Sequence, residues 1–244
     1  MAGSRTHWFA DENLSSESGS LAAANLVRAK SLRLKPGERI AVTNGRGLVA
    51  HCQVTKVSAQ KVDFSQLSLL ESPQPPQRTV IQALIKHDSV EDALRLATEF
   101  GATRLIPWQA ERSVLRWDAL RAEKQHARLT AISKEQALLN QNPWFPVVEA
   151  ACEELPSPSG MGLLLDGAAD TQLAALLSDQ TTSEPLSTDS LSVVVGPEGG
   201  LTDSEIESAV SLGYRPVSLG NTSFRSFSAG AAALSLINAR TRAS

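Results

Sequence analysis

A strand that ends in a glycine-rich turn at the start of a helix constrains this chain more than any other stretch. Residues 191–195 form a short apolar run, and the turn Gly-Pro-Glu-Gly-Gly follows at 196–200. Its glycines permit positive φ angles and a close approach of a ligand to the backbone, while Pro197 fixes one φ and removes a donor. Thr202 and Glu205 have the spacing of a capping box, which predicts that a helix begins there.

A second strand and bend follow about twenty residues later. Residues 216–219 predict a short strand that ends at Gly220, residues 221–228 form a polar loop with one cation, Arg225, and residues 229–239 predict a helix of small side chains. Open α/β sheets bind ligands at the carboxyl ends of their strands, so we expect both bends at one sheet edge. The pattern also fits a generic strand-turn-helix unit. It lacks the Lys and Ser/Thr of a P-loop and the spacing of a dinucleotide-binding fingerprint.

The remaining sequence predicts two parts. Residues 1–72 contain several short strand-like segments and an Asn-Gly hairpin signal at 44–45, which favours a small barrel because an open sheet of that size would expose its edges. The Pro-Gln-Pro-Pro-Gln stretch at 73–77 is an extended linker. Strands and helices then alternate, which predicts an α/β domain with a parallel sheet. In that domain we expect Ser89 to cap a helix over residues 90–100.

Charge and composition limit the classes of function. The net charge of −3 argues against a surface that binds nucleic acid throughout. Residues 1–72 nevertheless hold nine Lys/Arg against six Asp/Glu, while residues 73–244 hold fourteen against twenty. The basic surface of the first part could bind phosphates or be an ordinary solvated face. Two distant cysteines predict neither a disulfide framework nor a metal site, and no signal peptide or apolar run near ~20 residues is found. We therefore expect a soluble, cytoplasmic protein that needs no metal.

Several motifs together carry a resemblance to a known family. Val-Gly-Pro-Glu-Gly-Gly at 195–200, Leu-Gly at 219–220 and Phe-Arg-Ser at 224–226 resemble the cofactor-binding end of the RsmE family. RsmE proteins are SPOUT-class methyltransferases, which use S-adenosylmethionine to methylate N3 of a uridine in 16S ribosomal RNA. The resemblance covers nearly the whole chain in the same order, and its further segments lie at residues 32–38, 83–86, 96–101 and 111–114.

The resemblance implies a fold and partners that composition and periodicity do not indicate. It implies a SPOUT-type α/β domain with a parallel sheet over residues 78–244, and a PUA-like, RNA-binding β-barrel over residues 1–72. The C-terminal segment, residues 219–239, would thread a loop near the glycine turn and form a trefoil knot, which is a rare chain topology. The implied partners are 16S rRNA of the small ribosomal subunit and a second copy of the chain in a homodimer.

The resemblance also implies a binding site for S-adenosylmethionine. This cofactor carries no phosphate, so backbone donors and acceptors beside an apolar wall suit it, and glycine loops supply the backbone groups. The expected cofactor contacts are Leu165, Val195, Gly196, Pro197, Glu198, Gly199, Gly200, Leu219, Gly220, Phe224 and Ser226. The expected RNA contacts are Arg28, Arg33, Lys35, Lys86 and Arg112.

Arg225 is the expected catalytic residue. N3 of uridine is a poor nucleophile while it holds its proton, so a group must take that proton or stabilise the charge that develops on O2 and O4. A guanidinium can donate to those oxygens but cannot act as a base at neutral pH. A structural salt bridge is the other role open to Arg225. Glu198 is expected to cap backbone N–H groups at a helix N-terminus rather than to act as a base.

Two departures from the family pattern keep other functions open. The family places an acid where this chain has Phe227, and residues 138–142 lack the basic residues of the corresponding family segment. Either a partner subunit or the first part of the chain compensates, or the enzyme is impaired. The alternatives are therefore a SPOUT methyltransferase with another RNA target, and a catalytically impaired RNA-binding or ribosome-assembly factor.

Overall fold

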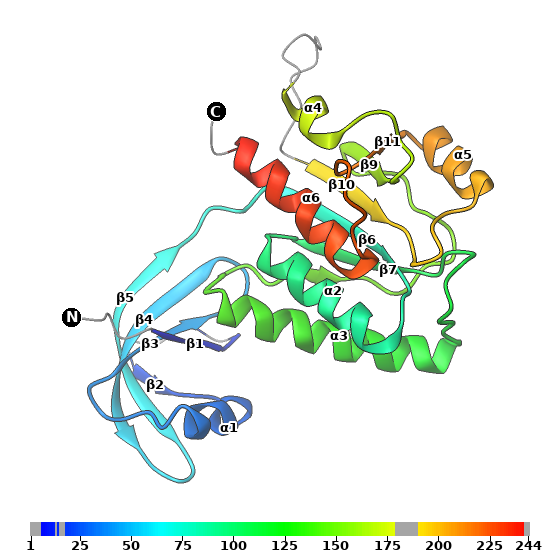
Figure 1. The fold of residues 1–244 in the computed structure, drawn as a ribbon. Helices are drawn as coiled ribbons and strands as arrows, with labels where there is room; N and C mark the ends of the chain where they lie inside the picture. The colour runs from blue at the N-terminus through cyan, green and yellow to red at the C-terminus, as the bar shows by residue number, and fades with distance from the viewer. Residues whose placement is uncertain (1–5, 13, 15–17, 179–189, 242–244) are drawn as a thin grey trace. The chain divides into compact units, whose positions relative to one another are not determined.

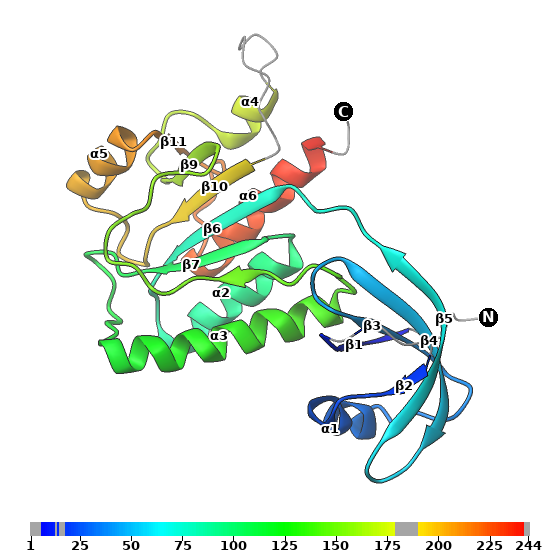
Figure 2. The same ribbon diagram turned by 180° about the vertical axis from the view of Figure 1, so that it is seen from behind.

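The computed structural model describes residues 6–12, 14, 18–178 and 190–241. The chain divides into two compact units (Figure 1; seen from behind in Figure 2). The first unit contains Met1–Pro75 together with Ala137–Phe145, and the second contains Pro76–Gln136 and Pro146–Ser244. The segment Ala137–Phe145, which the sequence placed in the second part, thus belongs to the first unit. No helix in the described part of the chain is long and apolar enough to cross a membrane.

The first unit is built on a five-stranded sheet in the order β1-β3-β4-β5-β2. β1 is parallel to β3 and the other pairs are antiparallel. No pairing joins β1 to β2 within the described residues, and closure into a barrel stays a prediction. The elements are β1 (His7–Ala10), β2 (Ser18–Ser20), α1 (Ala23–Ser31), β3 (Arg39–Thr43), β4 (Leu48–Val57) and β5 (Val62–Glu71).

The Asn-Gly signal marks the connection between β3 and β4, which confirms the predicted hairpin. The side-chain oxygen Oδ1 of Asn44 accepts from the N–H groups of Arg46 and Leu48, at 2.8 and 3.2 Å. Asn side chains form such local bonds readily, which is why they initiate turns. In β4 of this sheet Cys52 is fully buried, and its burial raises the pKa of the thiol to about 11.

The second unit is a six-stranded sheet in the order β11-β9-β10-β6-β7-β8, and every described pair in it is parallel. This confirms the predicted α/β domain with a parallel sheet. Its strands are β6 (Gln77–Ala83), β7 (Arg104–Trp108), β8 (Val147–Val148), β9 (Met161–Leu165), β10 (Ser190–Val195) and β11 (Tyr214–Val217). Its helices are α2 (His87–Glu99), α3 (Ala119–Leu139, which belongs to this unit as far as Gln136), α4 (Leu173–Ser178), α5 (Asp203–Ser211) and α6 (Ser226–Thr241).

Helices cover both faces of this sheet, which explains why successive residues of its central strand β10 are apolar and buried on both faces. Val193 and Val195 of β10 belong to an apolar cluster with residues of α2, α4 and α6. Val194 points to the opposite face and packs in a cluster with Ala209 of α5. On that face Tyr214 donates from its hydroxyl to the carbonyl of Pro156 at 2.8 Å, and burial raises the pKa of its phenol.

Three expected boundaries differ from the structure, and tertiary contacts account for two of them. α2 begins at His87 with Lys86 as N-cap and no side-chain cap, so the expected cap by Ser89 is wrong. A distant carboxylate, that of Glu198, accepts from the Lys86 N–H instead. α6 begins at Ser226 rather than at residue 229, and a tertiary bond from the Ser226 hydroxyl to the glycine turn holds its first residue. The strand β11 lies two residues earlier than expected.

Candidate functional site

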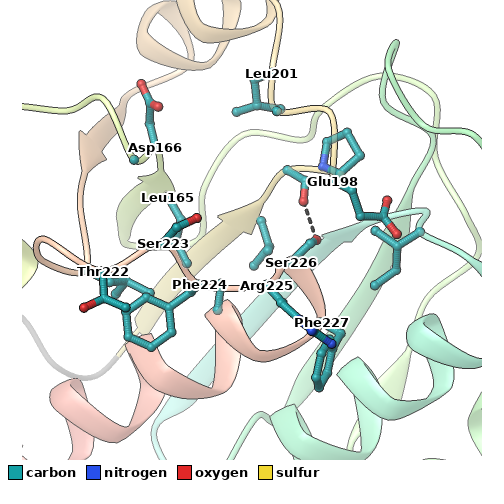
Figure 3. Close-up of a pocket in the computed structure, with 18 of the residues that line it drawn as sticks. Leu165, Asp166, Glu198, Leu201, Thr222, Ser223, Phe224, Arg225, Ser226 and Phe227 are labelled. Carbon is teal, nitrogen blue, oxygen red and sulfur yellow. Dashed lines mark hydrogen bonds between the residues drawn. The ribbon is translucent and has the colours of Figure 1, made fainter.

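A cavity of about 630 Å³ lies at the carboxyl edge of the sheet in the second unit (Figure 3). Its size is that of a small-molecule site, and its position is the one that α/β folds use for ligands. The glycine turn (residues 196–200) and the bend after β11 (residues 219–226, the second bend) meet in it. Its lining also includes Leu165 at the end of β9, the two residues that follow it, Ile85 and Ser89.

Two sets of hydrogen bonds hold the glycine turn from its helix side. The predicted capping box is confirmed, because Thr202 N donates to Glu205 Oε2 at 2.9 Å and Glu205 N donates to Thr202 Oγ1 at 3.3 Å. Arg112 reaches the turn from a segment 87 residues away in sequence. Its Nη1 donates to the carbonyls of Gly199 and Leu201, at 3.2 and 2.9 Å. These bonds satisfy carbonyl groups that would otherwise face solvent.

Glu198 ties the same turn to the start of α2. Its Oε1 accepts from the backbone N–H of Lys86, the N-cap residue of that helix, at 3.3 Å. The carboxylate therefore lies at a helix N-terminus, where a negative charge is stabilised. The expectation that Glu198 serves a helix start agrees with this contact. The helix is α2, however, and not α5, which follows the turn.

The second bend is joined to the glycine turn by a side chain. Ser226 Oγ lies 2.5 Å from the carbonyl oxygen of Gly196, the bond drawn as a dashed line in Figure 3. At the other end of the bend Gly220 has a φ of +121°, in a region that side chains rarely adopt. A Cβ at Gly220 would meet no atom within 4 Å, so the backbone there is open to a ligand.

Arg225 lines the cavity from the residue just before α6 and is exposed. The ion pairs found in the described part of the chain are Lys61–Asp63, Arg104–Glu149 and Arg128–Glu91. The alternative of a structural salt bridge for Arg225 therefore has no support among the described residues. A guanidinium in this position is available to a substrate that enters the cavity.

Most of the expected cofactor contacts line the cavity, and Gly199 does not. They are Leu165, Val195, Gly196, Pro197, Glu198, Gly200, Leu219, Gly220, Phe224 and Ser226. The expected RNA contacts lie outside it. Arg28 is half-buried on α1, Arg33 and Lys35 are exposed just beyond that helix, and Lys86 is exposed at the N-cap of α2.

Sequence reasoning missed Asp166 as a lining residue. It follows β9 directly, its N–H donates to the Val217 carbonyl at 3.0 Å, and its Oδ1 accepts from Ala168 N at 3.0 Å. The signal was present as an Asp-Gly pair at the carboxyl end of a strand, next to the strand that carries the glycine turn. Neighbouring parallel strands end at the same edge, so Asp166 belonged with the two bends.

The lining suits a nucleoside with a sulfonium group better than a phosphate-bearing cofactor. Leu165, Val195 and Val217 provide an apolar wall, and Asp166 provides an acceptor. Like Gly220, Gly167 would place a Cβ in open space, so main chain is exposed to the cavity at two points. No group of three or more His, Cys, Asp or Glu in the described segments could hold a metal ion. The residues present therefore fit S-adenosylmethionine.

Comparison with known families defines the class of this protein. A model described as an RNA methyltransferase domain matches residues 72–238, and one described as an RNA methyltransferase PUA domain matches residues 29–67. The first match spans more than half of the chain. The fold and the cavity thus belong to an RNA methyltransferase with an added PUA domain.

Individual relatives narrow the class. The ribosomal RNA small subunit methyltransferase E of Mycobacterium bovis is 31% identical over 216 residues, which are 86% of this chain and 81% of the relative. That of Bacillus subtilis is 30% identical over 219 residues, 86% of this chain and 85% of the relative. The chain belongs to the ribosomal RNA small subunit methyltransferase E family, the RsmE family. The enzyme of Neisseria gonorrhoeae, solved with S-adenosyl methionine bound, has the same fold, with a TM-score of 0.82 at 22% identity over 96% of this chain and 97% of that one.

Proposed function

We propose that this protein transfers the methyl group of S-adenosylmethionine to N3 of a uridine in 16S rRNA of the small ribosomal subunit. The observation that carries the proposal is the meeting of the two bends in one cavity, with Arg225 on its lining, in a chain of this family. The names of its relatives support the ribosomal RNA of the small subunit as the substrate class.

The cavity residues divide the work of holding the cofactor. Backbone groups of residues 196–198, 200 and 219–220 would hold the cofactor, and the Asp166 carboxylate would supply an acceptor for its hydroxyl groups. When bound, S-adenosylmethionine supplies an electrophilic methyl group on a sulfonium whose charge disappears as the methyl leaves. Leu165, Val195 and Leu219 exclude water from that position, which favours the loss of charge. Alignment of the two reactants contributes ~7 kcal/mol or more.

Arg225 stabilises the anionic form of the target base. Its guanidinium donates to O2 or O4 of the uridine as N3 releases its proton to solvent water, and it stays protonated throughout. Preorganised donors of this kind act most strongly where water is excluded. Phe227, at the position of the family's acid, is half-buried in the cavity lining and supplies no carboxylate there.

RNA binding is shared among basic residues of each unit. In the first unit Arg28, Arg33 and Lys35 are proposed to contact phosphates, and Lys86 does so in the second. We place the linker between the two functional domains at residues 73–77, with residues 1–72 as the RNA-binding domain and residues 78–244 as the methyltransferase domain. Arg112 is also proposed to contact an RNA phosphate, through guanidinium N–H groups other than those of Nη1, which donates to the carbonyls of Gly199 and Leu201.

Finer structural features follow from the family and complete the proposal. We infer that the first unit closes as a PUA-like barrel, and that residues 219–239 pass through a trefoil knot of the SPOUT type. The bond from Ser226 to Gly196 supports the knot, because it fixes the C-terminal segment against the glycine turn. The protein is proposed to act as a homodimer in the cytoplasm.

The experiment that tests the proposal is nucleoside mass spectrometry of 16S rRNA from a strain that lacks the gene. Loss of 3-methyluridine, restored by the intact gene, is the expected result. Persistence of 3-methyluridine with loss of another methylated nucleoside assigns a different RNA target. The departures at Phe227 and residues 138–142 favour one other candidate, an impaired assembly factor. An unchanged nucleoside profile in the strain that lacks the gene identifies that candidate, and calorimetry with S-adenosylmethionine then shows whether the protein has also lost its cofactor.

A further inference from the structure

A chain of hydrogen bonds connects the middle of the sheet to both bends of the cavity. Gln82 lies in β6 with only 2% of its surface exposed, and it pairs with Val195 in the sheet register. Its Nε2 donates to the carbonyl of Ala83 at 3.2 Å and to Ser226 Oγ at 3.1 Å. Ser226 Oγ in turn lies 2.5 Å from the carbonyl oxygen of Gly196. A residue 144 positions earlier in the sequence thus touches the start of α6.

Each bond of this chain has a fixed direction. The Ala83 carbonyl can only accept, so it must face the amide nitrogen of Gln82 and not the amide oxygen. The amide nitrogen can only donate, so the Ser226 hydroxyl accepts from it. The hydroxyl proton is then free for another acceptor, and the Gly196 carbonyl is the one in reach. The strand backbone therefore orients the amide, the amide orients the hydroxyl, and the hydroxyl holds the glycine turn.

A buried polar side chain at position 82 lowers the stability of the fold unless it forms hydrogen bonds. Its strand neighbours Val80, Ile81 and Ala83 are apolar and buried. Burying an amide costs free energy unless it finds hydrogen-bond partners, and an apolar residue of similar volume would fill the space as well. The partner that Gln82 finds outside its own strand is Ser226, whose hydroxyl is at the cavity.

Packing against the sheet holds the body of α6, and the hydrogen bonds of Ser226 hold its first turn. A Cβ on Gly230, one turn beyond Ser226, would lie 3.2 Å from Val80 Cγ1 and 3.3 Å from Val195 Cγ2. The helix therefore already rests on the sheet at Gly230 and cannot approach it further. Ser226, the first residue of the helix, is held in place by its bonds to Gln82 and Gly196. Arg225 directly precedes that residue, so its main chain is held with it.

We propose that Gln82 is a positioning residue for methyl transfer. Through Ser226 it sets the place of Arg225 relative to the glycine turn, and so aligns the group that faces the substrate with the group that faces the cofactor. This inference rests on the proposed function of the same cavity. A misplacement near 1 Å can lower a rate ~100-fold without loss of binding, because alignment is needed in the transition state.

The test compares Gln82→Met, Ser226→Ala and the double variant with the full-length wild type. Methionine keeps the length and volume of glutamine and removes the donor. We expect kcat with undermethylated small ribosomal subunits to fall at least tenfold in each variant. The KM for the subunits should stay within about threefold in each variant, and the Kd for S-adenosylmethionine should do so in Gln82→Met, because Gln82 is not part of the cavity lining. The double variant should be no slower than either single variant, because both residues belong to one chain of bonds.

Two further variants separate positioning from general damage. Ser226→Thr keeps the hydroxyl and should keep most of the rate. Gln53→Met is the matched control, because Gln53 also lies in a strand, β4, and its Nε2 donates to a backbone carbonyl, that of Gly37 at 3.2 Å, but on an exposed surface of the first unit. It should leave kcat unchanged. Thermal melting of all variants shows whether any loss of rate follows a loss of folded protein.

The outcomes distinguish this inference from the function on which it rests. If the wild type neither binds S-adenosylmethionine nor methylates the subunits, the proposed function fails. If the wild type is active and both Gln82→Met and Ser226→Ala keep its kcat, the positioning role is refuted while the function stands. Should Gln82→Met not fold, the half-buried Ser226→Ala still decides, since a wild-type kcat in that variant alone overturns the proposal.

Discussion

Gly220→Ala is expected to weaken both the fold and cofactor binding, and two other glycines separate these effects. Gly220 has a φ of +121°, and it lines the cavity. Gly37 in the first unit has a φ of +91° and Gly167 lines the cavity without such a φ, and at all three a Cβ would meet no atom within 4 Å. Gly37→Ala thus adds backbone strain alone, Gly167→Ala adds a methyl group at the cavity alone, and Gly220→Ala adds both.

The magnitudes follow from the backbone. A residue with a side chain in such a conformation costs about 1–3 kcal/mol. For a chain of this size each kcal/mol lowers Tm by roughly 2–4 °C, so Gly220→Ala and Gly37→Ala should each melt about 2–12 °C lower. Gly167→Ala should melt within about 2 °C of the wild type, since no atom obstructs the added methyl group.

Melting with and without S-adenosylmethionine is the assay. A ligand present at 100 times its Kd adds about 2.7 kcal/mol of stability. The wild type and Gly37→Ala should gain this increment in full, while Gly220→Ala should gain less because its added Cβ narrows the cavity. The reasoning is refuted if Gly220→Ala melts like the wild type, or if Gly37→Ala loses the ligand increment and Gly220→Ala keeps it.

Three further predictions follow from single side chains. Arg225→Ala should lower kcat ~100-fold or more while calorimetry gives an unchanged Kd for S-adenosylmethionine, and an unchanged rate would remove Arg225 from the mechanism. Arg112→Ala should raise that Kd about tenfold, because two carbonyls near the glycine turn lose their donor, whereas a rise in the KM for RNA alone would mean that Arg112 only contacts phosphate. Burial holds the pKa of Cys52 at about 11, so the unfolded thiol ionises first as pH rises. The stability from this proton is complete below about pH 8.5 and is lost toward pH 11, so urea unfolding should show a steeper decline in this window for the wild type than for Cys52→Ala.

The sequence predicted those parts of the site that depend on local rules. Thr202 and Glu205 lie three residues apart, so their capping box could be recognised without any knowledge of the fold. The meeting of the two bends followed from the rule that parallel strands end at one edge, because Val195 and Val217 each end a strand of the same sheet. The same rule would have found Asp166, had it been applied to every strand end.

The parts that could not be predicted depend on contacts between distant residues. Serine is a common N-cap residue, which is why Ser89 was expected to cap α2. The carboxylate that accepts from the N–H of the actual N-cap residue, Lys86, is that of Glu198, 112 positions away. Arg112 was expected to face RNA because a cation near an active site suggests phosphate, whereas its Nη1 donates to backbone carbonyls. No local pattern indicated that residues 137–145 belong to the first unit. In the first unit the ring of Phe145 packs against Gly45, where a Cβ would overlap it.

The same distant contacts explain how the site can keep its chemistry while its sequence departs from the family. The glycine turn is held by Glu198, Arg112 and Ser226, and each of these bonds is present here. None of them involves Phe227 or residues 138–142, where the chain departs from the family pattern. The bonds that hold the glycine turn are therefore independent of the substituted positions, while Phe227 itself lines the cavity. We expect a change in function to arise where the protein meets RNA, and it should appear as an altered KM or an altered target nucleotide while S-adenosylmethionine binding persists.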